Sequence, residues 1–325
     1  FPVATPETID PLLPLAEPLK EQIAFLPAVA QDIQAKGFDF VHGILGNGPA
    51  NAAMLISILT GIPFSFESHA FDLFVHFPDA AAKLAQCAFV QTESDYNRRY
   101  LIEECGAEPD KVEVIRLAPD IPMLSSIPEN PRIPGMVVSA CRLHAIKGLQ
   151  YGLEAFSRVH QKMPETSYVI IGDGPERPKL ERFAEILGIQ SAVKFAGDLP
   201  NETAAAIMSQ ASVFLLPCVL AKNGDRDGTP TALAEAQFLK TPVVSSKFSA
   251  IPELVEDGVT GILTEPGNVS EIADALSALL ADAPLRVSMG EAGRKKIVNE
   301  FNIQASTAHL VSLWERHAAE AKACV

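Results

Sequence analysis

The sequence lacks any apolar run long enough to span a bilayer, and its longest run, over residues 213–221, is far too short. Its first ten residues have no basic start followed by an apolar segment, so they do not indicate a secretory signal. The five cysteines are scattered and form no Cys-x-x-Cys pair, which favours a reducing compartment over a disulfide framework. We therefore expect a cytoplasmic protein.

Positive charge is also scarce, since the net charge is −14. Residues 1–135 hold 8 Lys and Arg against 18 Asp and Glu, and residues 136–325 hold 18 against 22. Neither part offers an evident basic face, so the composition favours neither a nucleic-acid partner nor peripheral binding to an anionic membrane. A hydrophobic fraction of 48% is typical of a globular protein with a filled core.

What the sequence does have is a regular alternation of short apolar runs with amphipathic stretches. The runs that predict strands are 39–45, 62–68, 87–92, 111–117, 136–140, 167–172, 192–197, 213–217, 241–246 and 261–264. Strands separated by helices, with continuous rather than alternating apolar character, predict parallel sheets covered on both faces. We therefore predict an α/β fold.

A Pro-rich connector divides this alternation. Five prolines between Pro119 and Pro134 predict an extended segment and a domain boundary near residue 130. We assign residues 1–130 to an N-terminal domain with the linker, and residues 131–325 to a C-terminal domain that includes an amphipathic terminal helix. Two such domains leave a cleft, and ligands of open parallel sheets bind beyond the carboxyl ends of the strands.

Two cations follow the first strand of the second half. Arg142 and Lys147 flank a short loop before a helix that we expect to begin near Gly148. Cations beside a helix N-terminus suit an anion such as a diphosphate, although a solvated surface pair is an equal alternative. After the next strand, the turn from Gly172 to Gly174 lets backbone approach a ligand, but a tight turn needs no ligand.

Two acids follow a later strand. Asp227 precedes a helix for which Thr229 is a plausible N-cap and Pro230 a plausible first residue, and Glu235 lies within that helix. Carboxylates repel a diphosphate and only accept hydrogen bonds, so we expect them to bind hydroxyl groups of a sugar and a ribose. Asp225 and Asp227 also form Asp-x-Asp, which leaves a divalent metal or a plainly solvated loop as alternatives.

In this order, the segments resemble the retaining glycosyltransferases of family 4, which have the GT-B architecture of two Rossmann-like domains facing across a cleft. The resemblance covers residues 135–300. It is carried by five segments. They are an Arg-x4-Lys-Gly segment (139–156), a Gly-x-Gly-Pro turn (170–181), the strand and loop that usually touch the base (193–202), a Glu-x7-Glu motif (227–236) and the sequence that ends the sheet (241–268). The first half looks like members acting in exopolysaccharide assembly, including the colanic-acid type, with His69 and Asp72 fitting a His-x-x-Asp element.

The resemblance implies transfer of a sugar, with retention at the anomeric carbon, from a UDP- or GDP-linked donor to a saccharide or lipid-linked acceptor, without a metal or other cofactor. Arg142 and Lys147 would bind the diphosphate, Glu235 the ribose hydroxyls, and Leu199 would lie against the base. His69 would reach the donor sugar and the reacting centre. The residues implied to orient the donor sugar are Asp227, Gly228, Thr229, Pro230 and Thr231.

The sequence departs from the family at three places. The first motif acid is Asp227 rather than Glu, and Thr241 stands where a Gly usually provides a left-handed helix cap. No strand or Gly-rich loop precedes Phe38, since residues 1–35 have an irregular Pro-rich start and one helix. We therefore expect the N-terminal domain to be incomplete at its start. A non-catalytic nucleotide-binding remnant or partner subunit is the alternative function.

Overall fold

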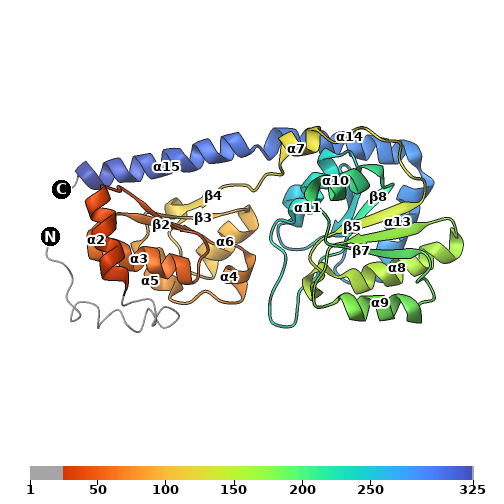
Figure 1. The fold of residues 1–325 in the computed structure, drawn as a ribbon, viewed down its shortest axis with the longest axis horizontal. Helices are drawn as coiled ribbons and strands as arrows, with labels where there is room; N and C mark the ends of the chain where they lie inside the picture. The colour runs from red at the N-terminus through yellow and green to blue at the C-terminus, as the bar shows by residue number, and fades with distance from the viewer. Residues whose placement is uncertain (1–24, 324–325) are drawn as a thin grey trace. The chain divides into compact units, whose positions relative to one another are not determined.

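A computed structural model describes residues 25–323, and their contacts divide the chain into two units (Figure 1). The first unit is Phe1–Arg116 with Gln304–Val325, and the second is Leu117–Ile303. The division therefore precedes the Pro-rich segment, whereas we expected it near residue 130. From residue 25 to residue 323, no helix combines the length and the apolar character that a membrane crossing requires.

The first unit contains a four-stranded parallel sheet in the order β1-β2-β3-β4. Its strands are β1 (Val41–Gly43), β2 (Phe64–Glu67), β3 (Phe89–Thr92) and β4 (Val112–Val114). Its helices are α2 (Leu26–Lys36), α3 (Gly48–Thr60), α4 (Ala70–Phe74), α5 (Ala80–Gln86), α6 (Asp95–Glu103), the 3-10 helix η3 (Pro109–Lys111) and α15 (Ile303–Ala323). The helix expected in the Pro-rich start corresponds to α2, and its expected part before residue 25 lies outside the described residues.

The second unit contains a six-stranded parallel sheet in the order β10-β9-β8-β5-β6-β7. Its strands are β5 (Met136–Ala140), β6 (Ser167–Ile171), β7 (Val193–Gly197), β8 (Val213–Leu216), β9 (Val243–Ser246) and β10 (Gly261–Thr264). Its helices are α7 (Ile121–Ser125), η4 (Ala145–Lys147, a 3-10 helix), α8 (Leu149–Lys162), α9 (Arg177–Ile186), α10 (Asn201–Gln210), α11 (Thr231–Phe238), α12 (Ile251–Leu254), α13 (Val269–Ala281) and α14 (Ala283–Glu300).

Both faces of this larger sheet are buried, as the continuous apolar runs predict. Val137 and Val138 are adjacent in β5 and both have no exposed surface. They belong to different clusters, because successive strand residues point to opposite faces. Val137 packs with residues of α8 and α13, and Val138 packs with residues of α10 and α11. The predicted α/β fold with parallel sheets is confirmed.

The Pro-rich connector is not wholly extended, because it contains the short helix α7. Pro122 lies in the first turn of this helix, where its missing N–H is not needed. Asp120 caps the helix by accepting a hydrogen bond from the backbone N–H of Met123 at 3.0 Å. The number of prolines therefore predicted a longer extended segment than the structure shows.

Thr241 does not prevent a left-handed turn after α11, because the preceding residue provides it. Lys240 has a φ of 59°, and Thr241 is fully buried. The Thr241 hydroxyl donates a hydrogen bond to the carbonyl of Met208 at 2.9 Å and accepts one from the guanidinium of Arg132. The departure from the family pattern is thus accommodated by two side-chain hydrogen bonds that a glycine could not make.

The terminal helix α15 belongs to the first unit, which corrects our assignment of it to the C-terminal domain. Leu313 is 2% exposed and packs with Phe89 in β3 and with Ile115, which directly follows β4. The Ser306 hydroxyl donates a hydrogen bond to the carbonyl of Arg116 at 2.9 Å. In Figure 1 the helix, drawn in blue, runs beside the strands of the first unit. Amphipathic periodicity predicted the buried face correctly but could not identify the sheet that covers it.

We expect Leu313→Ala to destabilise the first unit by about 2–5 kcal/mol, because it removes a buried side chain and leaves a cavity. Trp314 is the only tryptophan of the chain, so its fluorescence during urea denaturation follows this unit. Val311→Ala is the matched control, since Val311 lies on the same helix and is 38% exposed. Equal losses for both variants would contradict the packing of α15.

Candidate functional site

Two of the loops that carry predicted donor-binding residues leave the larger sheet side by side, at β5 and β8. β5 lies between β8 and β6, so the order of strands reverses at β5. Open parallel sheets bind ligands at such a reversal, outside the carboxyl ends of the strands. Arg142 and Lys147 follow β5, whereas Asp227 and Glu235 follow β8.

A close backbone approach brings these two loops together. Gly148 has a φ of 64°, and a Cβ atom there would lie 1.9 Å from the carbonyl oxygen of Pro217. The N–H of Val219 donates a hydrogen bond to the carbonyl of Ile146 at 2.8 Å. Only glycine fits this position without displacing the backbone. The approach therefore holds η4, with Lys147, against the loop that carries Asp227.

Lys147 and Asp227 form an ion pair, in which the ammonium group donates to Oδ2 of the carboxylate. Their side chains are only 12% and 14% exposed. Burial lowers the pKa of Lys147, but Asp227, Cys218 and Cys141 together raise it more, so the net shift is upward. The sequence suggested separate ligands for these residues, and here each is the partner of the other.

Two thiols adjoin the ion pair, and sequence reasoning missed both. Cys218 Sγ lies 3.6 Å from Oδ2 of Asp227 and donates to it. Burial raises the pKa of Cys218 well above its usual value and that of Cys141 to about 12. Both groups are therefore neutral thiols at physiological pH. Their positions just after β5 and β8 were the signal, although neither forms a motif.

The glycine turn after β6 serves the packing of its neighbouring loop. A Cβ atom on Gly172 would lie 2.0 Å from the carbonyl oxygen of Cys141, and one on Gly174 would lie 2.6 Å from that of Leu143. The N–H of Leu143 donates to the carbonyl of Asp173 at 2.8 Å. These contacts alone account for the glycines. They also fix the backbone on both sides of Arg142, whose side chain is exposed.

Helix α11 begins at Thr231 with Pro230 as its N-cap, so the prediction of Thr229 as the N-cap is wrong by one residue. Proline has no side-chain acceptor, and the first-turn N–H groups therefore lack a side-chain cap. The Thr229 Oγ1 atom is buried and has no hydrogen-bond partner within the described part of the chain. Thr229 therefore places a buried hydroxyl group without a described partner just before the start of this helix.

Glu235 lies one turn into α11 and is partly buried. Burial raises the pKa of its carboxyl group. Between residues 25 and 323, the structure shows no ion pair to this carboxyl group. Leu199, predicted to lie against the base, is partly buried on the apolar cluster that includes α10 and α11. Both assignments as ligand-binding residues stay predictions.

The Asp-x-Asp sequence does not form a common site. Asp227 pairs with Lys147, whereas the backbone of Asp225 bonds to Ala221 and Asn223 at 2.9 and 3.1 Å. Within the described residues, no three His, Cys, Asp or Glu side chains are grouped so that they could hold a metal ion. The expectation that transfer needs no metal stays a prediction.

In the first unit, His69 lies between two carboxylates that sequence reasoning missed. Its Nδ1 atom is 3.1 Å from Oε2 of Glu93, and its Nε2 atom is 3.5 Å from Oε1 of Glu67. Burial lowers the pKa of His69, but hydrogen bonds to Glu67 and Glu93 raise it more, to about 10. His69 and Glu93 each follow one of two adjacent parallel strands, which was the available signal. Asp72 caps α4 by accepting from the N–H of His69 at 3.0 Å, so its capping interpretation is confirmed.

A buried lysine orders the Gly-rich loop after β1. Lys83 has no exposed surface, and its ammonium group donates to the carbonyl of Gly46. The N–H of Gly46 donates to Oδ2 of Asp72 at 2.7 Å, so this loop is held from both sides. The Lys83 nitrogen also lies 4.9 Å from the centre of the Phe77 ring. Burial lowers the pKa of Lys83 to about 8.

Comparison with known proteins identifies relatives of the chain. A family model described as "Glycosyl transferases group 1" matches residues 125–296. WcaL of Escherichia coli (strain K12), a candidate colanic acid biosynthesis glycosyltransferase, is 32% identical over 214 residues, covering 65% of this chain and 53% of that protein. The amylovoran biosynthesis glycosyltransferase AmsK of Erwinia amylovora is 36% identical over 191 residues, covering 56% and 45%. The chain spans about half the length of these curated relatives.

The fold also has solved counterparts. The crystal structure of Alr3699/HepE from Anabaena in complex with UDP matches with a TM-score of 0.75 and 18% sequence identity. The match covers 92% of this chain and 84% of that chain. At this identity the likeness shows the fold alone, and it confirms the predicted GT-B class.

We expect Asp227→Asn to lower the free energy of unfolding of the second unit by about 3–5 kcal/mol, because it leaves the Lys147 ammonium group buried without its counter-charge. Urea denaturation followed by circular dichroism measures the loss. Asp225→Asn, in the same loop, is the control and should change stability by less than about 0.5 kcal/mol. Similar losses for the two variants would show that the ion pair is not the cause.

The carboxylates around His69 should make its contribution to stability pH-dependent. A folded-state pKa of about 10 against the ordinary value of 6.5 gives stability that is complete below pH 6.5 and is lost as the pH rises toward 10. Glu93→Gln should therefore cost most near pH 6 and progressively less toward pH 10, measured by urea denaturation. In an NMR titration, the His69 ring of the unmodified chain should stay protonated at pH 8. A ring that titrates near 6.5 would overturn this account.

Proposed function

The chain belongs to the glycosyl transferases group 1 family, and from this membership we propose that it is a retaining transferase that uses a nucleotide diphosphate sugar. Its sugar donor is UDP- or GDP-linked. Its acceptor is a saccharide or a lipid-linked saccharide, of the kind assembled into exopolysaccharides such as colanic acid and amylovoran. The family membership makes an enzyme the favoured function over a non-catalytic remnant.

One observation carries the proposal, namely a buried ammonium group at the strand reversal whose counter-charge a diphosphate can replace. Lys147 stays charged because Asp227 is its partner, and the exposed guanidinium of Arg142 follows the same strand. A donor diphosphate offers Lys147 stronger acceptors than one carboxylate does. Asp227, once released, is free to accept hydrogen bonds from hydroxyl groups of the donor sugar.

The remaining donor contacts come from α11. Glu235 is a partly buried carboxyl group that accepts hydrogen bonds from the ribose hydroxyls. The N–H groups of Gly228, Thr229 and Thr231 lie at the start of the helix, where backbone dipoles favour negative charge, and Pro230 sets the angle at which the chain enters. Leu199 supports the base.

In the transfer step, the bond between the anomeric carbon and the diphosphate oxygen breaks, and a bond to the acceptor oxygen forms on the same face. The proton of the acceptor hydroxyl passes to the departing diphosphate oxygen. Lys147 and Arg142 stabilise the charge that develops on that leaving group. His69, which Glu67 and Glu93 keep positively charged, is unsuited to act as the proton acceptor.

We expect this chain to bind UDP or GDP, and Lys147→Met to weaken the binding by about ten- to a hundredfold, since one charge-assisted hydrogen bond is lost. Isothermal titration measures both affinities, and Glu235→Gln should weaken the binding further through the ribose. Lys162→Met removes an exposed lysine of α8 and serves as the control. Absence of binding to either nucleotide, or an unchanged affinity of Lys147→Met, would overturn the proposal.

A turnover assay distinguishes an enzyme from a non-catalytic binding protein. The enzyme releases UDP or GDP from the matching nucleotide sugar when a saccharide acceptor is supplied. A non-catalytic relative binds the nucleotide with the same dependence on Lys147 but releases none.

A further inference from the structure

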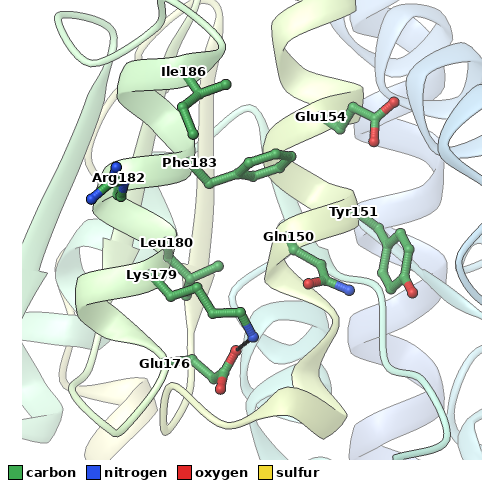
Figure 2. A pocket seen from close by; sticks show the side chains of 9 residues that line it. All are labelled: Gln150, Tyr151, Glu154, Glu176, Lys179, Leu180, Arg182, Phe183 and Ile186. Carbon is green, nitrogen blue, oxygen red and sulfur yellow. Dashed lines mark hydrogen bonds and ion pairs between the residues drawn. The ribbon is translucent and has the colours of Figure 1, made fainter.

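A trough on the second unit lies between α8 and α9, and none of its lining residues has a role in the function proposed above (Figure 2). Its first part is a cavity of about 320 Å³. A second cavity of about 570 Å³ shares five lining residues with it and extends to residues 219–223. These sizes are typical of small-molecule sites, and the shared wall makes the trough elongated.

The floor of the trough is apolar and partly aromatic. Figure 2 shows the Phe183 ring projecting from α9 toward α8, whereas the Tyr151 ring on α8 points away from α9. Leu180, which is 3% exposed, lies at the floor, and Ile186, which is 72% exposed, lies at the open edge. An isoleucine this exposed beside an aromatic ring offers apolar area that a ligand can cover.

The rim carries balanced charges and amides. Lys179 pairs with Glu176 at 2.8 Å, as the dashed line in Figure 2 marks, and Arg182 and Glu154 lie on the two helices. Gln150 adds an amide with both donors and an acceptor. This rim supplies hydrogen-bond donors and acceptors in similar measure, so it favours a neutral polyhydroxylated ligand over a diphosphate or a cation.

We propose that this trough binds an oligosaccharide, namely a stretch of the acceptor or product away from its reacting end. A pyranose ring has an apolar face of C–H groups that packs on an aromatic floor, and hydroxyl groups that exchange hydrogen bonds with a mixed rim. The elongated shape suits several linked sugars. This inference rests on the proposed function for the source of the saccharide, but the binding itself needs no donor.

The trough is connected to the donor-binding loop through the backbone. Val219 and Ala221 line its second part. The N–H of Val219 bonds to Ile146 of η4, and the N–H of Ala221 bonds to the carbonyl of Asp225 at 2.9 Å. A saccharide in the trough therefore contacts the loop that continues to Asp227, which places chain recognition beside donor recognition in one unit.

The test uses the whole chain and oligosaccharides from hydrolysed colanic acid and amylovoran, fractionated by chain length. Saturation-transfer NMR detects binding, and titration gives the affinity. Phe183→Ala removes the aromatic floor, and Ile186→Glu places a charge on it at a site exposed enough to preserve folding. Phe38→Ala is the control, since it truncates an aromatic side chain that is 55% exposed in the first unit.

We expect longer fractions to bind more tightly than short ones, and both trough variants to weaken that binding by about tenfold or more. Phe38→Ala should bind as the unmodified chain does, and all variants should bind UDP or GDP equally. Failure of nucleotide binding alone counts against the proposed function, not against the trough. The inference is overturned if no fraction binds, if both trough variants bind like the control, or if sedimentation shows that the trough joins two copies of the chain.

Discussion

The ion pair between Lys147 and Asp227 is the interaction on which the second unit's site depends. Removing two charges from water costs several kcal/mol per ion, and their attraction offsets that cost only when the geometry is good. A pair of apolar side chains would fill the same space at a lower cost in desolvation free energy. The sequence nevertheless keeps the ions, and it keeps Gly148, which is required for the loops to approach each other. We infer that the pair keeps a charged ammonium group in a mostly buried position, where the low dielectric constant strengthens its attraction for a bound anion.

The first unit also pairs a partly buried cation with carboxylates at the ends of its strands. There a single imidazolium lies between two carboxylates, and a fully buried lysine holds the loop after β1 through a backbone carbonyl. His69 and Glu93 each follow one of two adjacent parallel strands, and Glu67 is the last residue of the strand that precedes His69, whereas the buried lysine lies within α5. The ends of these parallel strands therefore position titratable groups, and the pKa values of several of these groups depart from their ordinary values.

The parts of this structure that the sequence predicted are those governed by local patterns. The strands followed from continuous apolar runs, since both faces of a parallel sheet are buried, and the glycines and prolines at helix ends followed from backbone geometry. Pairings between distant residues could not be predicted. Lys147 and Asp227 are 80 residues apart, and neither residue type indicates the other. Likewise, nothing local to Thr241 shows that Lys240 takes the left-handed conformation, or that Arg132 lies within reach of the hydroxyl.

The position of α15 has a consequence for the order in which the two units fold during synthesis. The second unit is an insertion in the chain of the first, because Ser306 contacts Arg116, which lies 190 positions earlier in the sequence. During synthesis, the smaller sheet leaves the ribosome before α15 does. Its apolar surface around Phe89 is covered only when α15 has also been made. The second unit can complete its own core in the meantime, since domains fold as units. The sheet of the first unit is thus made before the second unit but is covered only after it, so its apolar surface needs protection from aggregation during that interval.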